Sequence, residues 1–328
     1  MKKHTTRSKK QKSAGKKKYQ VRNWKEYNEA LVNRGKMMFW ITEEAIRDWE
    51  EKRKTRKRGK PKFFSNMAIE TALTLREVFH LPLRQTEGFL TDVLRILGAS
   101  VIAPDYSTLS KRSEGLPVLI RTRPIQDEPL HIVVDSTGAK VYGEGEWKVR
   151  QHGWSKRRTW RKLHIGVDEA TNDILIGAVT TNAASDGEML SPMLAELPAD
   201  TVIAQVSADG AYDKEVCYDA LERRGVPVIA IPPQRNARIR IHGNALAPPH
   251  QRDKNLRCIR KIGRKRWKEE TGYHRRSIAE TTMFRLKTVF TDKVRSVKLA
   301  NQRVQLLLRC KALNRMTMLG MPDSYIVA

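Results

Sequence analysis

Two aspartates stand where short apolar runs of the sequence end. Asp135 closes a run that begins at His131, and Asp209 closes another run, with Gly210 behind it to permit a tight turn. Strand ends that converge at one edge of a sheet are where α/β proteins gather ligand and metal sites. Two or three carboxylates with substrate phosphates suffice for Mg²⁺, which prefers oxygen ligands and keeps several waters. An aspartate at a strand end is also a common turn-former, so this pair alone leaves both interpretations open.

Two further aspartates show why position alone does not decide the role. Asp168 opens the turn Glu169-Ala-Thr-Asn-Asp173 between two predicted strands. Asp213 stands where the N-cap of the next predicted helix belongs. We expect both residues to be structural.

A third carboxylate lies on a predicted helix with an ordered polar face. Tyr273, Arg276, Glu280 and Lys287 follow one another at steps of 3, 4 and 7 residues, which places them in a narrow arc of a helix. We expect Glu280 to complete a metal site, with Arg276 and Lys287 holding phosphates beside it. The alternative is a solvated face with an ordinary i, i+4 ion pair. The adjacent face is apolar and consists of Ala279, Met283, Leu286 and Phe290.

The composition indicates a polyanionic partner. Lys+Arg total 63 against 36 for Asp+Glu, a formal net charge of +27. Such a charge repels itself in a compact fold unless a polyanion neutralises it, and nucleic acid bound through its phosphates is the usual one. A basic protein without any chemistry is the alternative. We find no apolar run of about 18 residues and no signal-peptide core, which argues against a membrane partner.

The cysteines favour a reducing compartment. They are far apart, odd in number and in no C-x-x-C pair, so neither a disulfide framework nor a zinc site is predicted. They are Cys217, Cys258 and Cys310.

The first 127 residues divide into a basic lead and a small helical domain. Residues 1–62 are expected to form a basic arm, an amphipathic helix over 24–51 and a linker that ends in Gly59-Lys60-Pro61. Residues 63–127 are expected to form a helical domain, with one helix capped by Ser65 and a second ended by Gly98.

A short polar helix is predicted over residues 105–113. A helix, a turn and a short helix rich in Ser, Thr, Lys and Arg form the layout of a helix-turn-helix, whose last helix enters the major groove. A plain packing bundle is the alternative. On the helix-turn-helix interpretation, the DNA-contacting side chains are Ser107, Thr108, Lys111 and Arg112.

From residue 130 the pattern changes to alternating strands and helices. A mixed α/β sheet with flanking helices is predicted over 128–318, with a tail at 319–328. The region 235–268 has twelve Lys/Arg and one acid, and we expect a mobile basic loop there. Strands are expected at 131–135, 160–168, 174–181, 202–208 and 226–231, and helices at 186–197, 213–224, 270–292 and 300–316.

Three blocks of sequence resemble bacterial insertion-sequence DDE transposases. The spacing Y-x-x-R-x-x-x-E-x-x-x-x-x-x-K, from Tyr273 to Lys287, resembles their signature around the third acid and matches at all four positions. Asp135-Ser-Thr-Gly and Asp209-Gly-Ala-Tyr-Asp213 resemble the blocks around the first and second acids. With N-terminal similarities such as Trp24-Lys-Glu-Tyr27, the resemblance runs from about residue 22 to about 316. The family typified by insertion sequence five is the most similar branch.

The resemblance implies an RNase H-like catalytic core preceded by an α-helical DNA-binding region. It implies Asp135, Asp209 and Glu280 as the DDE triad, holding two Mg²⁺ ions for which Mn²⁺ substitutes. It also implies that the N-terminal part binds the terminal inverted repeats of the element. The expected reaction is metal-dependent strand cleavage followed by strand transfer. Arg276 and Lys287 are then DNA contacts, and Tyr273 is either a DNA contact or a structural residue.

A basic aromatic segment joins the first two predicted strands. Residues 147–160 interleave three tryptophans with five Lys/Arg and no acid. As a hypothesis, Trp154 stacks on a base near the cleavage point. The alternative is that these tryptophans pack the sheet edge. His152 and His164 are expected to be structural, because magnesium sites favour oxygen ligands.

The expected partners are double-stranded DNA, both element ends and target, and further copies of the chain in a homodimer or larger assembly. The expected location is the cytoplasm of a bacterium, at the nucleoid. Two other functions fit part of the sequence. One is a non-catalytic, sequence-specific DNA-binding protein, and the other is an RNase H-like nuclease that only cuts.

Overall fold

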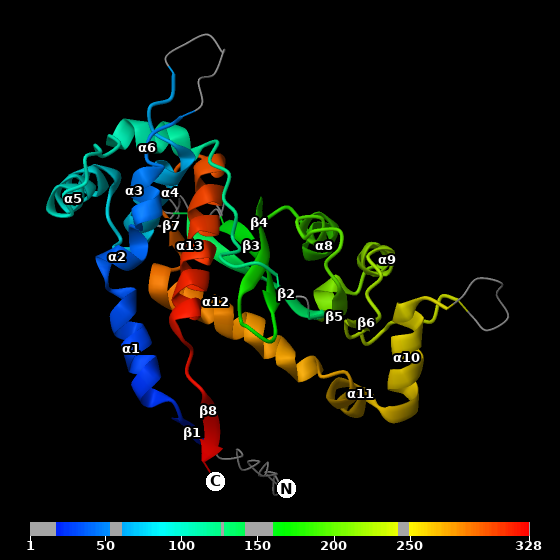
Figure 1. Ribbon diagram of the computed structural model, residues 1–328. Coiled ribbons are helices and arrows are strands. Elements are labelled where there is room, and N and C mark those ends of the chain that lie inside the picture. Colours follow the sequence, from blue (N-terminus) through cyan, green and yellow to red (C-terminus); the bar gives the residue numbers. More distant parts are fainter. Residues whose placement is uncertain (1–17, 53–60, 126–127, 142–159, 242–248, 328) are drawn as a thin grey trace, which may run out of the picture.

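The computed structural model describes residues 18–52, 61–125, 128–141, 160–241 and 249–327 (Figure 1). Its centre is a sheet with the strand order β4-β3-β2-β5-β6, and a short β7 pairs with the end of β2. The strands are β2 (Leu130–Val141), β3 (Trp160–Asp168), β4 (Ile174–Thr181), β5 (Ile203–Ala208), β6 (Val228–Ala230) and β7 (Lys293–Val294).

The strand directions divide the sheet into two halves. β2, β3 and β4 are antiparallel neighbours, and the side chain of Asp168 accepts the N–H of Thr171 at 3.1 Å in the tight turn between β3 and β4. β5 is parallel to β2, and β6 is parallel to β5 because helix α9 (Glu215–Arg223) carries the chain back between them. The predicted α/β class is therefore confirmed, and the order matches the RNase H-like sheet that the resemblance implies.

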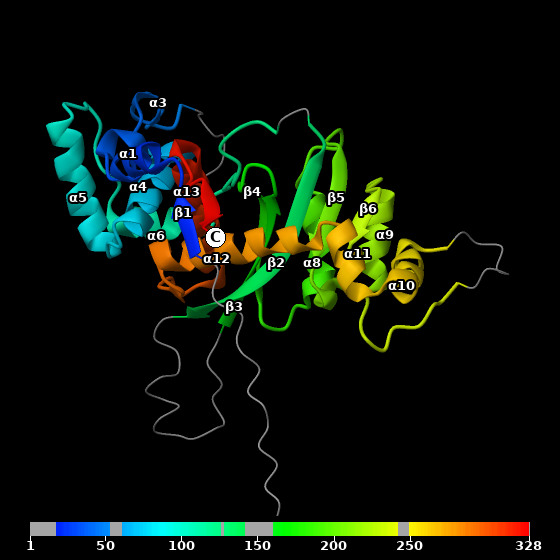
Figure 2. The same ribbon diagram turned by 90° about the horizontal axis from the view of Figure 1, so that it is seen from below.

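Both faces of the sheet are covered, because successive side chains of a strand point to opposite faces. Ile132 and Val134 of β2 pack in one cluster with helix α9 and helix α8 (Asp186–Leu194). Val133, between them, packs in the opposite cluster with α12 (Ser277–Phe290) and α13 (Leu299–Leu319). Figure 2 shows α12 crossing one face of the sheet, with α8 and α9 lying near β5 and β6.

The N-terminal segment is more broken than the sequence predicts. The single helix expected over 24–51 is wrong: the chain forms α1 (Trp24–Arg34), α2 (Met37–Trp40) and α3 (Glu43–Arg47). Gly35 ends the first, and the hydroxyl of Thr42 accepts the N–H of Ala45 to start the third. Both breaks follow ordinary capping chemistry.

The three helices predicted over 65–113 are confirmed. α4 (Asn66–Val78) is capped by Ser65, whose hydroxyl accepts the N–H of Ala68 at 3.1 Å. Gly98, with a φ of 65°, follows the end of α5 (Leu83–Ile96). α6 (Tyr106–Ser113) begins at the cap residue Asp105, which accepts the N–H of Thr108.

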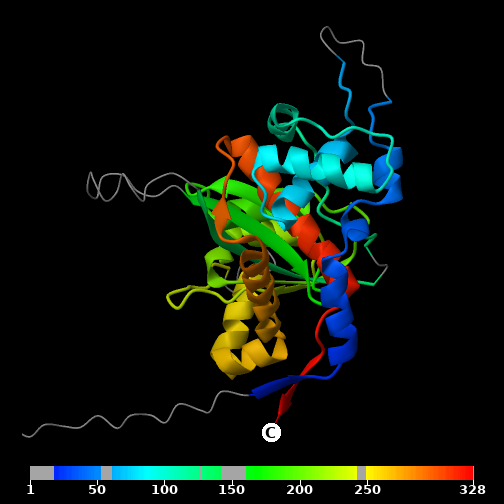
Figure 3. The same cartoon turned by 90° about the vertical axis from the view of Figure 1, so that its left-hand side faces the viewer.

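The N-terminal helices and the sheet share one hydrophobic core. Residues of α4 and α5 belong to the same buried cluster as residues of β3, α12 and α13. Glu77 of α4 is buried against Arg309 and Gln305 of α13, at 2.7 Å and 3.0 Å. Figure 3 shows α13 (red) running past the cyan N-terminal helices. The domain boundary at residue 127 stays a prediction, because the described residues on both sides of it share one core.

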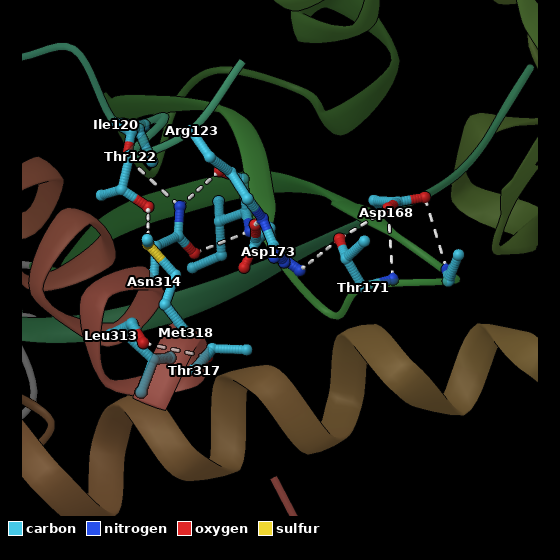
Figure 4. Close-up of polar contacts among 12 residues, drawn as sticks. Ile120, Thr122, Arg123, Asp168, Thr171, Asp173, Leu313, Asn314, Thr317 and Met318 are labelled. Atoms are coloured by element: carbon cyan, nitrogen blue, oxygen red, sulfur yellow. Dashed lines mark hydrogen bonds and ion pairs between the residues drawn. The ribbon is translucent and has the colours of Figure 1, made fainter. Parts of the chain in front are cut away.

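A polar junction ties the segment before β2 to the sheet and to α13 (Figure 4). The amide of Asn314 donates to the carbonyls of Ile120 and Ile174 and accepts the N–H of Ile174 at 2.8 Å. Arg123 forms an ion pair with the buried Asp173 in the β3–β4 turn. These contacts fix the path of the chain into β2, the strand that carries Asp135.

Residues 249–270 are ordered, contrary to the sequence prediction. A mobile basic loop was expected across 235–268, and this is wrong for α10 (Gln251–Ile262) and α11 (Arg264–Glu270). At the two ends of the described chain, β1 (Lys18–Val21) pairs antiparallel with β8 (Ser324–Val327). Among the described residues, none of the helices combines the length and apolar character that crossing a lipid bilayer requires.

Candidate active site

The register of the sheet places Asp135 beside Asp209. β2 and β5 are parallel, and their last paired residues are Val134 and Ala208. Asp135 is the next residue of β2, and Asp209 is the first residue after the end of β5, so the two aspartates are neighbours. The prediction that a strand ends at Asp135 is wrong, because β2 continues to Val141, where it pairs with β3 and β7. The carboxyl end of β5 is a position at which open α/β sheets place ligands.

Local hydrogen bonds orient both aspartates. The carboxylate of Asp135 accepts the N–H of Ser136 at 2.8 Å. The carboxylate of Asp209 accepts the N–H of Ala211 at 2.8 Å and caps the short 3₁₀ helix η2 (Gly210–Tyr212). Each carboxylate thus has one side fixed by the backbone, which limits its rotation.

Glu280 approaches from the helix that crosses the sheet. Its helix, α12, contacts β2 and β3. The side chain of Glu280 is about half exposed, at 55%. The predicted apolar stripe, Ala279, Met283, Leu286 and Phe290, is buried as expected. Glu280 is therefore held by a rigid helix and faces open space on the same side as Asp135.

Arg276 connects the acids. Its guanidinium donates to the carboxylate of Asp135 at 3.1 Å and to the carboxylate of Glu280. Arg276 is in a 3₁₀ turn, η3 (Tyr273–Arg276), and α12 begins only at Ser277, so the continuous helix predicted over 270–292 is wrong for its first part. The turn brings the arginine across to β2 instead of leaving it on the outer face of α12.

The electrostatics of Asp135 agree with three clustered acids. Burial raises the pKa of Asp135, the charges of Asp209 and Glu280 raise it further, and the Ser136 N–H and Arg276 oppose the rise. Within the described ranges, no three potential ligands already enclose a metal position. The donor set nevertheless suits Mg²⁺, because Asp135, Asp209 and Glu280 offer only carboxylate oxygens. A cationic group, the guanidinium of Arg276, already lies between two of these carboxylates.

Tyr273 is packed into the interior of this fold. Its side chain is buried, and its ring packs against Trp267 with centroids 6.1 Å apart. The Lys268 ammonium lies 4.8 Å from the ring centroid and the Arg276 guanidinium 5.9 Å. Of the two interpretations of Tyr273, the burial favours the structural one.

Lys287 lies farther along α12. It follows Glu280 by seven residues, which is about 10 Å along the axis at 1.5 Å per residue. Its charge contributes to the lowered pKa of Asp292, for which the hydrogen bond from Lys140 is the main cause. Lys287 is therefore on the site side of α12 but not in contact with the acids, and its role with phosphates stays a prediction.

The polar helix α6 uses most of its predicted DNA contacts inside the protein. The hydroxyls of Ser107 and Thr108 donate to Asp105, and Arg112 donates to the Phe64 carbonyl. Lys111 is exposed. Residues 97–105 join α5 to α6, a longer connection than the three or four residues of a helix-turn-helix turn. DNA binding by these four residues stays a prediction.

The structure describes some of the remaining predicted residues and not others. Trp154 and His152 lie outside the described residues. His164 is fully buried with Nε2 at 2.9 Å from the Thr180 hydroxyl, which confirms a structural role. Asp213 is structural but is not the predicted N-cap, because Lys214 takes that position. Asp213 instead pairs with Arg252 at 2.8 Å in the interior.

Sequence reasoning missed Tyr212, which lies behind the acids. Its side chain is buried and its hydroxyl has no hydrogen-bond partner among the described residues. Burial raises the pKa of Tyr212, and the charges of Asp186, Asp135 and Asp209 raise it further. A neutral phenol is therefore kept next to the carboxylates. The position was visible in the string Asp209-Gly-Ala-Tyr, but the string alone does not show which face the tyrosine takes.

An α/β fold of this strand order defines a class of RNase H-like proteins when one acid lies on the central strand, one at the end of the adjacent parallel strand and one on a crossing helix. Two family models, both described as "Transposase DDE domain", match residues 32–144 and residues 126–315. Because the second alone covers more than half of the 328 residues, the chain belongs to the DDE transposases of insertion sequences. Membership of the branch typified by insertion sequence five stays a prediction.

Proposed function

We propose that this transposase binds the terminal inverted repeats of its own insertion sequence, cleaves the DNA strand at the element end and joins that end to target DNA. The observation that carries the proposal is the adjacency of Asp135 on β2 and Asp209 at the end of β5, with Glu280 linked to Asp135 through Arg276. The family membership supports DNA as the substrate.

Asp135, Asp209 and Glu280 are the residues that would hold two Mg²⁺ ions, with Mn²⁺ as the natural substitute. When bound, such ions activate the attacking oxygen and stabilise the leaving oxygen of an in-line displacement. The backbone N–H groups of Ser136 and Ala211 each bind one oxygen of the two aspartates, which leaves the other oxygen of each for a metal ion. Burial of Asp135 strengthens its attraction for a cation, because fewer waters screen the charge.

Two displacements at phosphorus account for cleavage and joining. In the first, a water oxygen bonds to the scissile phosphorus, the bond to the 3′-oxygen breaks, and that oxygen takes up a proton. In the second, the freed 3′-hydroxyl bonds to a phosphorus of the target strand and displaces that strand's own 3′-oxygen. Each phosphodiester broken in the second step is replaced by one formed. No covalent intermediate with the protein is required.

Cationic residues around the acids position the phosphate. Arg276 can give up its carboxylate partners for a phosphate oxygen, since a guanidinium forms equivalent paired hydrogen bonds with either anion. Lys287 follows on the same helix and is placed for the next phosphates along the strand. The N-terminal helices would read the inverted repeat, and pairing two ends would require at least two copies of the chain.

Strand cleavage of DNA that carries the gene's own flanks tests the proposal. In Mg²⁺, the wild-type protein is expected to cut at the flank ends and to join the freed ends to a plasmid. A matched DNA with scrambled flanks is expected to remain intact, and Glu280→Gln is expected to be inactive. Cutting without joining would identify a nuclease, and flank-specific binding without any cutting by the folded wild type would identify a DNA-binding protein.

A further inference from the structure

The hairpin of α10 and α11 presents cations that the protein does not neutralise. Lys254, Arg260, Lys261 and Lys265 are all exposed, and within the described ranges they form neither ion pairs nor side-chain hydrogen bonds. We refer to these four as the hairpin cations. Lys254 and Lys261 are seven residues apart and therefore lie on one face of α10. The exposed acids of α11 are Glu269 and Glu270, and Glu270 already pairs with Arg266 at 2.9 Å, so the surface remains positive.

The opposite face of the hairpin is clamped to the catalytic sheet. Trp267 and Tyr273 pack against Ala230 of β6, with Ile259 and Ile262 alongside. The hairpin bends at Gly263, whose φ of 85° suits glycine. The cations are consequently carried on a platform with a fixed position relative to the sheet.

Polar contacts strengthen the same clamp. Arg252 of α10 pairs with the buried Asp213 at 2.8 Å, and both side chains are withdrawn from solvent. The amide of Asn255 donates to the Ile229 carbonyl of β6 at 2.7 Å. Asp253 accepts the N–H of Ile241 at 2.8 Å. These buried polar residues of α10 bind the helix to the rest of the protein, whereas the hairpin cations are exposed.

The platform adjoins the acids. Lys268 of α11 and Arg276 both contact the ring of Tyr273, and Arg276 reaches Asp135. Figure 1 shows α11 leading directly into α12, the helix of Glu280, with α10 beside it beyond β6. A duplex held at the acids can therefore extend over the hairpin.

We propose that the hairpin cations bind the phosphate backbone of the duplex whose scissile phosphate lies at the acids, without reading its sequence. This inference rests on the proposed function for the identity of that duplex. Exposed ammonium and guanidinium groups contact phosphates in any sequence. The amide of Asn255 is buried in the clamp, and the amide of Gln251 donates to it at 3.3 Å, so both amides of α10 are engaged within the protein.

The test compares two variants that each lose four positive charges. In the first, Lys254, Arg260, Lys261 and Lys265 are replaced by Gln. In the second, four exposed cations that already pair with carboxylates are replaced by Gln. They are Arg22, Lys52, Arg95 and Lys298, paired with Asp323, Asp48, Asp92 and Glu114. Thermal unfolding verifies that both variants fold.

The first readout is the affinity of the full chain for a random-sequence duplex as a function of salt. Loss of four phosphate contacts is expected to reduce the slope of log K against log salt by about 3 to 4, at about 0.9 per contact. The paired-cation variant is expected to change the slope by less than about 1. Equal slopes for the two variants would overturn the proposal.

The second readout locates the contact on the DNA. On DNA that carries the gene's flanks, a photo-crosslinking amino acid at Lys261 is expected to label one strand at a fixed distance from the element end, whereas the same residue at Lys298 is not. Labelling spread over the duplex, or none, would contradict a fixed platform. Both readouts are independent of cleavage, so a chain that binds through the hairpin but never cuts would refute the proposed function and leave this inference standing.

Discussion

Replacing Arg276 by Gln should make the protein bind Mn²⁺ more tightly and cut DNA more slowly. Arg276 now acts as an internal counter-cation for Asp135 and Glu280. A divalent cation has to displace that guanidinium, and Gln offers no charge to displace. The same substitution removes the group that we propose holds the scissile phosphate. A change that raises metal affinity while lowering the rate is not expected from a general disturbance of the fold.

The size of the effect follows from the geometry. Two unit charges 3.1 Å apart attract by about 5 kcal/mol at an effective dielectric of about 20. Most of this is offset by the cost of withdrawing both groups from water. Glu280 is more than half exposed, so solvent screens its share. A net of about 1.4 kcal/mol remains, which corresponds to about tenfold in the dissociation constant of Mn²⁺.

Calorimetric titration of DNA-free protein with Mn²⁺ measures the affinity, and single-turnover cleavage measures the rate. Arg275→Gln is the matched control, because it removes the same charge from a neighbouring residue that pairs with Glu169 instead of the acids. The control is expected to bind Mn²⁺ like the wild type. Unchanged or weaker Mn²⁺ binding by a folded Arg276→Gln protein would refute the reasoning.

Three further predictions concern stability. Glu77→Gln leaves Arg309 buried without its charge partner and should lower the free energy of unfolding by about 3 kcal/mol, with one transition in urea because both regions share a core; two transitions would contradict that. Asp213→Ala strands Arg252 in the same way and should cost a similar amount, and a neutral effect would contradict the clamp. Because burial raises the pKa of Asp135, its ionised form opposes folding above the ordinary pKa, so Asp135→Asn should gain about 0.5–1 kcal/mol at neutral pH and lose that gain at pH 3, as thermal unfolding at both values can show.

The sequence predicted the elements whose pattern is local. Apolar runs marked β5 and the first part of β2, and the aspartates that follow them are neighbours because the parallel register pairs Val134 with Ala208. Ser65 and Gly98 marked helix ends through capping chemistry that acts within a few residues. The apolar stripe of α12 was equally readable, since its four residues lie at helical spacing.

The predictions that were wrong concern residues whose partners are distant in the sequence. α10 and α11 contain many cations and few apolar residues, so the sequence shows no apolar stripe in either helix. Their apolar residues, chiefly Trp267, are anchored by packing against β6. Asp213 looked like a helix cap because its true partner, Arg252, is 39 residues away. Likewise, the bridge from Arg276 to Asp135 crosses 141 residues of sequence. No spacing rule within one helix predicts contacts of that kind.

We propose that Asp209, and not its neighbour Asp213, belongs to the catalytic acids. Strand cleavage of flank DNA in Mg²⁺ should be compared for Asp209→Asn and Asp213→Asn, at a temperature where both are folded. We predict that Asp209→Asn loses activity by at least about a hundredfold, since metal ions supply several kcal/mol of transition-state stabilisation, while Asp213→Asn keeps most of it. Equal activity of the two variants, or a loss confined to Asp213→Asn, would contradict the assignment.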